Sequence, residues 1–139
     1  MSELYIDASD HVVGRLASNV AKALLKGDKV FVVNAEKAVV SGGKDNVKDH
    51  YIQKVQRGDP YHGPFYPKTP DRLIKRVVRG MIPKKPRGKI ALKNLMVYIS
   101  VPEELSKKKF QKIKTAENKL ECSYTELGKL CSLVSGIKY

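Results

Sequence analysis

The sequence contains two groups of residues whose types and spacing could carry out chemistry. One is a set of three side chains near the N-terminus, Asp7, Asp10 and His11. Carboxylates and imidazoles of this kind hold metal ions or transfer protons in hydrolytic sites. Because no second acidic cluster completes such a site, we predict structural roles, with Asp10 as the N-cap of the next helix and Asp7 as an acceptor for turn amides. An RNA-processing enzyme that uses Asp7 and Asp10 is the alternative.

The other group is cationic and much larger. Residues 72–93 contain nine Lys or Arg and no acidic residue, and residues 107–114 contain five more Lys, again without an acid. Residues 1–50 have no net charge, so the whole excess of +13 belongs to residues 51–139. Like charges at this density repel one another unless a polyanion compensates them. The distribution therefore predicts a polyanionic partner, and nucleic acid is the commonest one.

A helix at 71–80 is expected to present much of this charge. Its cations have no acidic residue at i±4 to pair with, and arginine offers a planar fork that suits phosphate. We expect its apolar face to pack on the sheet through Leu73, Ile74, Val77 and Val78. The residues that we predict to bind RNA are Arg15, Arg57, Tyr61, His62, Lys68, Arg72, Lys75, Arg76, Arg79, Lys84, Lys85, Arg87, Lys89 and Lys93.

Residues 58–70 form the only long irregular segment, with four prolines and two glycines. Loops of this length inside a compact domain are usually functional or disordered, and the rings among rigid prolines argue against disorder. Those rings could stack on unpaired bases, or each could cover the core beneath the loop. Both options stay open for Tyr61, His62, Phe65 and Tyr66.

Hydrophobic periodicity predicts the elements that position these groups. Apolar runs at 4–7, 29–33, 38–40 and 96–101 are typical of short buried strands. A helical stripe from Val13 to Leu24, which Gly27 terminates, lies between the first two runs and completes a βαβ unit. Further helices are predicted at 44–56, 71–80 and 89–95.

The boundaries of the later helices carry their own signals. Thr69 is predicted to cap the helix at 71–80, and Gly80 to end it. Residues 103–121 are lysine-rich and are expected to form an exposed connection with some helix. Residues 123–126 match a capping box, which is predicted to open a short terminal helix whose Leu127, Leu130, Cys131 and Val134 can dock on the body.

Composition excludes several classes of protein. A chain of 139 residues with 42% hydrophobic residues suits one folded domain and argues against wholesale disorder. No apolar run is long enough for a membrane span, and the first residues do not resemble a secretory signal, so we expect a cytoplasmic protein. The first strand–helix turn lacks a nucleotide-binding glycine motif, and Cys122 and Cys131 form no metal pattern. We expect no metal, cofactor, small-molecule substrate or membrane partner.

Four strings stand in a distinctive order along residues 4–104. They are Ile6-Asp7-Ala8 with Val13-Gly14-Arg15-Leu16-Ala17, then Val32-Val33-Asn34-Ala35-Glu36-Lys37, then Val78-Arg79-Gly80-Met81-Ile82-Pro83, and then Gly88 with Leu95-Met96-Val97-Tyr98. In order and spacing they resemble the large-subunit ribosomal protein thirteen family. Residues 44–70 and those after Pro102 resemble its archaeal branch.

The resemblance implies a three-layer α/β/α domain with a four-stranded, mainly parallel sheet. It implies a single domain over 1–139, with a core at about 4–104 and a lysine-rich extension at 105–139 that ends in a helix. It also implies a structural role in the large ribosomal subunit, without catalysis, with ribosomal RNA and neighbouring ribosomal proteins as partners. A sequence-specific DNA-binding factor is a weaker alternative, because no helix-turn-helix or dimer seam is evident.

Overall fold

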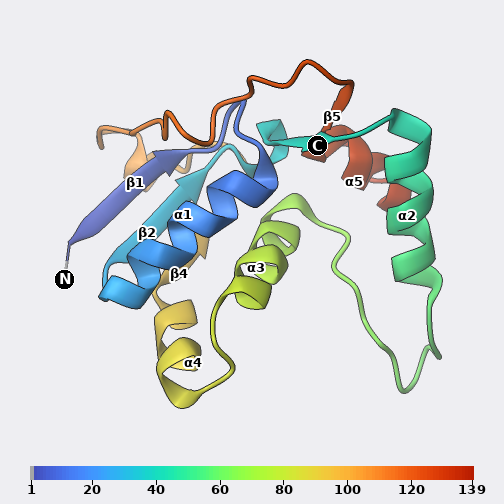
Figure 1. Cartoon of the computed structure of the whole chain (residues 1–139), viewed down its shortest axis with the longest axis horizontal. Coiled ribbons are helices and arrows are strands. Elements are labelled where there is room, and N and C mark those ends of the chain that lie inside the picture. The colour runs from blue at the N-terminus through green and yellow to red at the C-terminus, as the bar shows by residue number, and fades with distance from the viewer. Residues whose placement is uncertain (1) are drawn as a thin grey trace.

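The computed structural model describes residues 2–139 and contains a parallel sheet with helices packed against it (Figure 1). The sheet has three strands, β1 (Glu3–Asp7), β2 (Lys29–Val33) and β4 (Leu95–Val97), in the order β1-β2-β4. Both strand pairs are parallel. The predicted α/β class with a mainly parallel sheet is confirmed, although this sheet has three strands rather than four.

The apolar run at 38–40 forms a strand in a different sheet. β3 (Val39–Ser41) pairs antiparallel with β5 (Tyr124–Glu126) in a separate two-stranded sheet. The chain turns away from the parallel sheet at Asn34, which has a left-handed φ of 55° and precedes the short 3-10 helix η1 (Ala35–Lys37). A polar residue tolerates this conformation better than a β-branched one, so the turn belongs at this position.

The predicted capping box at 123–126 is wrong, because most of these residues form β5. The helix α5 (Leu127–Ser135) follows directly and has no side-chain cap. The amide of Leu127 instead donates to the carbonyl oxygen of Ala38 at 2.7 Å, and the carbonyl of Ser123 accepts from Gly42. Pairing with β3 therefore satisfies backbone groups that a capping box would otherwise have served.

Helices α1 (Val13–Lys26) and α3 (Pro70–Met81) lie against each other and cover one face of the parallel sheet (Figure 1). The predicted stripe of α1 is confirmed as its buried face, with Leu16, Val20 and Leu24 almost fully enclosed. Gly27 ends α1 as predicted, with a left-handed φ of 101° and its amide directed at the last-turn carbonyls. Helix α4 (Pro86–Lys93) contacts α1 and β4.

The prediction that Asp10 caps α1 is wrong. The N-cap position is Val12, and no side chain bonds there. Asp10 stands two residues earlier with a φ of 58°, its amide donates to Lys37 O, and its carbonyl accepts from Asn118. The turn before α1 is thus held by backbone partners that are distant in sequence.

The ends of α3 differ from the prediction in detail. Thr69 occupies the N-cap position, but its side chain makes no capping bond, and Oγ1 is a buried polar atom without a partner. The helix continues past Gly80 to Met81, and Ile82 is the C-cap residue. Ile82 is buried in the core, which keeps the helix end close to the body.

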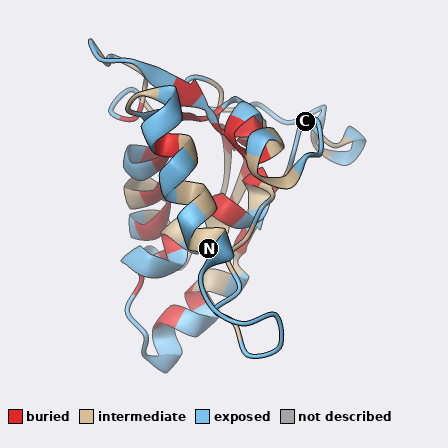
Figure 2. Cartoon of the chain, turned by 90° about the vertical axis from the view of Figure 1, so that its right-hand side faces the viewer, coloured by how far each residue is buried: buried red, intermediate tan, exposed pale blue. Residues whose placement is uncertain are grey.

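The remaining helices close one end of the molecule. α2 (Lys44–Gln56) contacts α5, and α5 packs against η1 and α3. Gly128 makes the close approach to η1 possible, because a Cβ there would lie 3.0 Å from both the Cβ and the carbonyl oxygen of Glu36. Figure 2 shows buried residues on the inward sides of these helices and exposed residues on their outer sides and in the loops.

The second face of the parallel sheet carries Tyr5, Phe31 and Met96, because side chains alternate along each strand. The rings of Tyr5 and Phe31 stack with centroids 5.0 Å apart, and Phe110 packs edge-on against Tyr5 at 6.4 Å. The chain that covers this face is therefore residues 108–110 of the predicted connection rather than a helix, and Met96 stays partly exposed. The connection contains one short 3-10 helix, η2 (Glu103–Leu105).

Candidate nucleic-acid interface

Helix α3 builds the centre of the cationic surface. Leu73, Ile74 and Val78 are fully buried, and Val77 is half-buried on the same side. Burial of this face fixes the rotation of the helix about its axis. As predicted, the opposite side is cationic: Arg72, Arg76 and Arg79 are exposed, and Lys75 is half-buried.

Few of the charges within residues 2–139 are neutralised by the protein itself. Lys129 Nζ forms a direct ion pair with Glu126 at 3.2 Å, and the ring Nδ1 of His62 is hydrogen-bonded to Asp59 at 3.0 Å. Neither pair involves a residue of the stretch 72–93. The cations of α3, of the following loop and of α4 therefore face one another and the solvent, and a bound polyanion would relieve their repulsion.

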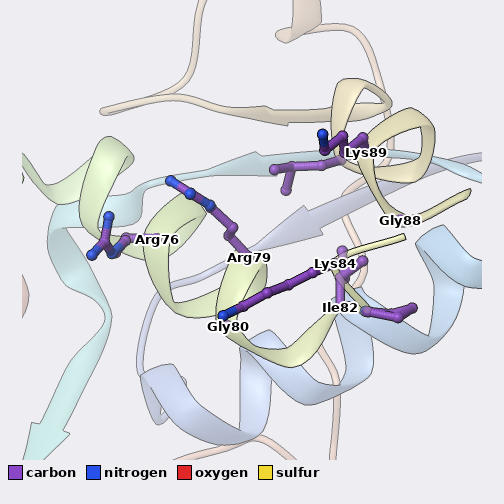
Figure 3. Close-up of a pocket in the computed structure, with 9 residues that line it drawn as sticks. Arg76, Arg79, Gly80, Ile82, Lys84, Gly88 and Lys89 are labelled. Carbon is purple, nitrogen blue, oxygen red and sulfur yellow. The ribbon is translucent and has the colours of Figure 1, made fainter. Parts of the chain in front are cut away.

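A cleft of about 440 Å³ lies between the C-terminal half of α3 and the N-terminal half of α4. Its cationic side chains come from three segments: Arg76 and Arg79 from α3, Lys84 from the loop, and Lys89 from α4 (Figure 3). None of the described residues that line it is acidic, and its floor includes apolar groups such as Ile82 and Leu92. An opening whose charged lining residues are all cationic suits a phosphate-bearing ligand.

Gly88 holds the two sides of this cleft close together. A Cβ at this position would overlap the carbonyl oxygen of Pro83 and would lie 2.7 Å from Cγ2 of Ile82. Only glycine therefore lets the first turn of α4 lie against the loop that follows α3. The sequence patterns above contain Gly88 only as part of the fourth string and do not predict this close approach. The glycine two residues after Pro86, inside a predicted basic segment, was the available signal.

The side chain of Arg87 makes a hydrogen bond within the protein. Its Nη2 donates at 3.0 Å to the carbonyl oxygen of Leu25, which lies in the last turn of α1. The last carbonyls of a helix have no intrahelical partner, so this bond satisfies one of them and ties α4 to α1. The other predicted cations of this region, Lys85 and Lys93, are exposed.

The aromatic rings of the loop at 58–70 differ in burial. Tyr66 is half-buried, packs edge-on against Tyr51 at 6.1 Å, and has the guanidinium of Arg76 5.8 Å from its ring centroid. Burial raises the pKa of Tyr66 above its ordinary value, and the charge of Arg76 opposes that shift. By contrast, Tyr61 is 88% exposed and Phe65 is 70% exposed. Tyr66 thus covers the core, whereas the other two rings face solvent.

The tip of the loop is held in shape by its own hydrogen bonds. The amide of Gly63 donates to the carbonyl of Asp59 at 2.9 Å, and the carboxylate of Asp59 accepts from the amide of Tyr61 and from the ring of His62. The His62 bond, followed by the Tyr61 bond, lowers the pKa of Asp59. The tip therefore presents Tyr61 and the exposed His62 on a defined turn.

A second cleft, of about 250 Å³, lies between this loop and the end of α2. Arg57 and Lys68, both predicted to bind RNA, line it together with Phe65 and Tyr66. Because Arg76 lines the first cleft and also lies over Tyr66, the two clefts adjoin. We call the surface that they share, from Arg57 to Lys93, the α3–α4 face.

Among the described residues, no contact joins Arg15 to the α3–α4 face. It is exposed on α1, four residues before Asn19, so the two side chains share one side of the helix. The amide of Asn19 lies 3.3 Å from Oγ1 of Thr115 in the connection. Arg15 therefore accompanies the C-terminal connection, and the predicted set of RNA-binding residues divides between two parts of the surface.

The residues around Asp7 have structural partners. Oδ1 of Asp7 accepts from the amide and hydroxyl of Ser9 and from the side-chain amide of Asn34, at 2.7 to 3.0 Å. Burial alone would raise the pKa of Asp7, but the bonds from Asn34 and Ser9 outweigh it and lower the pKa. A general acid at neutral pH needs a raised pKa, so these contacts agree with the predicted role as a turn acceptor.

His11 is fully buried and both of its ring nitrogens are occupied. Nε2 accepts from the amide of Ile113 at 3.0 Å, which leaves Nδ1 to donate to the carbonyl oxygen of Ser9 at 2.8 Å. The ring is thus held in one neutral tautomer and has no nitrogen free for a metal or a substrate. Within residues 2–139, no three His, Cys, Asp or Glu side chains are grouped as metal ligands would be.

Comparison with known proteins identifies the family. Residues 2–104 match the family described as ribosomal protein L13. A protein named large ribosomal subunit protein uL13 from Methanopyrus kandleri is 49% identical over 113 residues, covering 81% of this chain and 71% of that protein. The uL13 of Archaeoglobus fulgidus is 50% identical over 112 residues, covering 80% and 72%, and that of Picrophilus torridus is 43% identical over 132 residues, covering 94% and 96%.

No helix among residues 2–139 has the length and apolar character needed to cross a bilayer. The match over residues 2–104 includes α1, the three strands of the parallel sheet, α3 and α4, and therefore both sides of the cationic cleft. On these grounds the chain belongs to the ribosomal protein L13 family.

Proposed function

We propose that this protein is a structural component of the large ribosomal subunit that binds folded ribosomal RNA through the α3–α4 face and acts at the ribosome in the cytoplasm. The observation that carries the proposal is the cleft lined by Arg76, Arg79, Lys84 and Lys89, in which no described acidic residue compensates the charge. Membership of the L13 family supports it, because the relatives are named as proteins of the large ribosomal subunit.

Phosphate groups of the RNA backbone fit this cleft by charge and by geometry. Two arginines on one side supply bidentate donors, and two lysines on the other supply mobile point charges. The buried face of α3 holds the backbone in place, so the guanidinium groups lose less freedom when RNA binds. The role is stabilisation of an RNA fold, with no catalytic step.

The loop at 58–70 adds a means of recognising unpaired bases. Tyr61, His62 and Phe65 are exposed on a turn held by internal hydrogen bonds, and Arg57 and Lys68 lie beside them. Base stacking on such rings contributes about 1–3 kcal/mol for each base. We place these rings against a single-stranded bulge or loop of the RNA, next to the segment whose phosphates occupy the cleft. Neighbouring ribosomal proteins are further partners in this proposal.

The test is a binding titration of the full-length protein with large-subunit ribosomal RNA over a range of salt concentrations. Four phosphate contacts in the cleft predict a log–log slope of roughly −3, at about −0.7 to −0.9 for each contact. Arg76→Glu/Arg79→Glu should bind more weakly with a shallower slope. The control Lys44→Glu/Lys138→Glu makes the same change of charge on exposed residues outside the α3–α4 face. A nearly flat slope, or equal binding by the two variants, would refute the proposal.

A second measurement addresses the ribosomal role directly. The wild-type protein is expected to sediment with large subunits at moderate salt, and the Arg76→Glu/Arg79→Glu variant to be depleted from that fraction. A wild-type protein found only in the free fraction would contradict the ribosomal role, even if the isolated protein binds RNA.

A further inference from the structure

A second cationic surface lies on the C-terminal connection. Lys107, Lys108, Lys109, Lys112 and Lys114 are all exposed, and no acidic residue interrupts residues 107–114. The direct ion pairs within residues 2–139 involve none of these lysines. We call this group of five lysines the connection surface. Its charge density is comparable to that of α3, although none of these lysines was among the predicted binding residues.

Backbone hydrogen bonds at Gln111 and Ala116 attach the connection to the rest of the protein, so its lysines have a defined position. Gln111 donates to the carbonyl of Tyr5 at 2.8 Å and accepts from the amide of Asp7 at 3.2 Å, which adds one residue to the outer edge of β1. Further along, the fully buried Ala116 accepts from Val12 at 2.8 Å. A lysine-rich tail without an anionic partner would repel itself and stay extended in solvent.

Most of these lysines have no partner within the described residues of the protein. Lys108 has an internal contact, with Nζ 5.3 Å from the ring centroid of Tyr5, and Lys112 is near enough to Asp7 to help lower its pKa. Lys107, Lys109 and Lys114 have no side-chain hydrogen bond among the described residues. Concentrated charge on an ordered backbone is the arrangement expected for a surface that an anion covers.

The connection surface and the α3–α4 face lie on different sides of the molecule. β1 is one edge of the parallel sheet and β4 is the other, with the connection beside β1 and α4 against β4. The faces differ too, because Lys108 and Phe110 cover Tyr5 on the side of the sheet opposite to α1 and α3. Figure 1 shows the connection passing beside β1, well away from α4. A single short RNA helix on one surface therefore does not reach the other.

We propose that the connection surface is a second, independent RNA-binding site, so that the protein holds two separate segments of RNA at once. The inference rests on the proposed function and adds a bridging role to it. The ligand is the phosphodiester backbone, because the site offers mainly lysines, which act as point charges without the fixed fork that reads base edges. This site therefore contributes affinity and position, whereas the exposed rings of the loop at 58–70 contribute base contacts.

The test counts short RNA hairpins on the full-length protein by native mass spectrometry. Each hairpin has a fully paired stem too short to reach both surfaces. Wild-type protein is expected to carry two hairpins. Lys109→Glu/Lys114→Glu should carry one, Arg76→Glu/Arg79→Glu should carry one, and the variant with all four changes should carry none. Lys44→Glu/Lys138→Glu, with the same change of charge as each double variant, should still carry two.

The outcomes separate this inference from the proposed function. If wild-type protein carries one hairpin and loses it in Arg76→Glu/Arg79→Glu, the second site is refuted and the proposed function stands. If Lys109→Glu/Lys114→Glu alone reduces two hairpins to one, the second site stands and the α3–α4 face is refuted. If Lys109→Glu/Lys114→Glu still carries two, the lysines serve another anion, such as an acidic protein segment, and the inference is overturned. Melting curves of each variant establish that the fold is intact.

Discussion

The imidazole of His11 accepts a hydrogen bond through Nε2 from the backbone amide of Ile113, which lies 102 residues later in the chain, at 3.0 Å. The other ring nitrogen donates to Ser9, so one side chain joins the turn before α1 to the C-terminal connection. This bond lies between the Gln111 and Ala116 contacts and holds the lysines of the connection surface against the body.

Replacement of His11 should therefore loosen the connection. His11→Ala leaves a part-buried amide and a part-buried carbonyl without their partner and creates a cavity, which together cost about 3 kcal/mol of unfolding free energy. Chemical denaturation measures the loss, and limited proteolysis should show new cleavage within residues 107–115. The control is His50→Ala, an exposed histidine on α2, with an expected change of about 0.5 kcal/mol or less. Equal effects of the two changes would contradict the role of His11.

Charge reversal on α3 should affect binding and leave the fold intact. Arg76→Glu removes one proposed phosphate contact and the contact with Tyr66, the latter worth about 0.5–1 kcal/mol. The melting midpoint should fall only slightly, while RNA affinity falls markedly. Val78→Asp buries an unpaired charge in the core and should abolish folding. Val78 is the informative position because it is fully buried, whereas Val77 is half-buried. A large loss of stability in Arg76→Glu would show that Arg76 serves mainly the fold, through contacts such as that with Tyr66, and would contradict its placement on the RNA surface.

Two glycines at the cleft should respond oppositely to the same substitution. At Gly80 an added Cβ meets open space within a helix, so Gly80→Ala should raise stability by up to about 1 kcal/mol. At Gly88 it meets the carbonyl oxygen of Pro83, so Gly88→Ala should lower stability by about 1–3 kcal/mol and weaken RNA binding by displacing α4. Thermal melts of both variants measure stability, and an RNA titration of each measures binding. Stabilisation by Gly88→Ala would show that the close approach is not required.

The two cysteines should differ in reactivity toward a thiol reagent. Burial raises the pKa of the Cys131 thiol to about 12, whereas Cys122 is exposed. Because the thiolate is the reacting species, native protein at pH 8 should take up one adduct, on Cys122, and a second only after denaturation. Mass spectrometry of wild-type protein and of Cys122→Ser measures this. Rapid labelling of native Cys122→Ser would contradict the enclosed position of Cys131.

Asp7 should stabilise the fold at neutral pH and lose that effect in acid. Its folded pKa is lowered, so its contribution is fully present above the unfolded pKa of about 3.9 and is lost as pH falls through the folded value. Asp7→Ala should cost about 2 kcal/mol at pH 7 and much less near pH 3, with RNA affinity unchanged. Asp10→Asn, which alters an exposed carboxylate and keeps a residue that accepts positive φ, is the control. Loss of an RNA-cleaving activity in a folded Asp7→Ala protein would favour an enzyme.

Structural features that depend on residues close together in the chain were predictable from the sequence. The stripe of α1, its end at Gly27, and the division of α3 into an apolar and a cationic face all depend on spacings of three and four residues. Burial of one stripe determines which side faces solvent, so the exposure of Arg72, Arg76 and Arg79 followed from the sequence by itself. The βαβ unit followed in the same way, because its strands and helix are consecutive.

Features that depend on a distant partner were decided by the tertiary structure. Ser123 and Glu126 fit a capping box, yet β3 supplies better backbone partners: Glu126 lies in β5, and the carbonyl of Ser123 accepts from Gly42. Asp10 has the right residue type for an N-cap. Its backbone hydrogen bonds with Lys37 and Asn118, however, hold it two residues before the N-cap position, which is Val12. The same holds for the connection surface, whose lysines are evident in the sequence while their place beside β1 depends on Gln111 and His11. A backbone amide or carbonyl bonds to whichever partner the folded chain brings within reach, so the local sequence does not determine which partner that is.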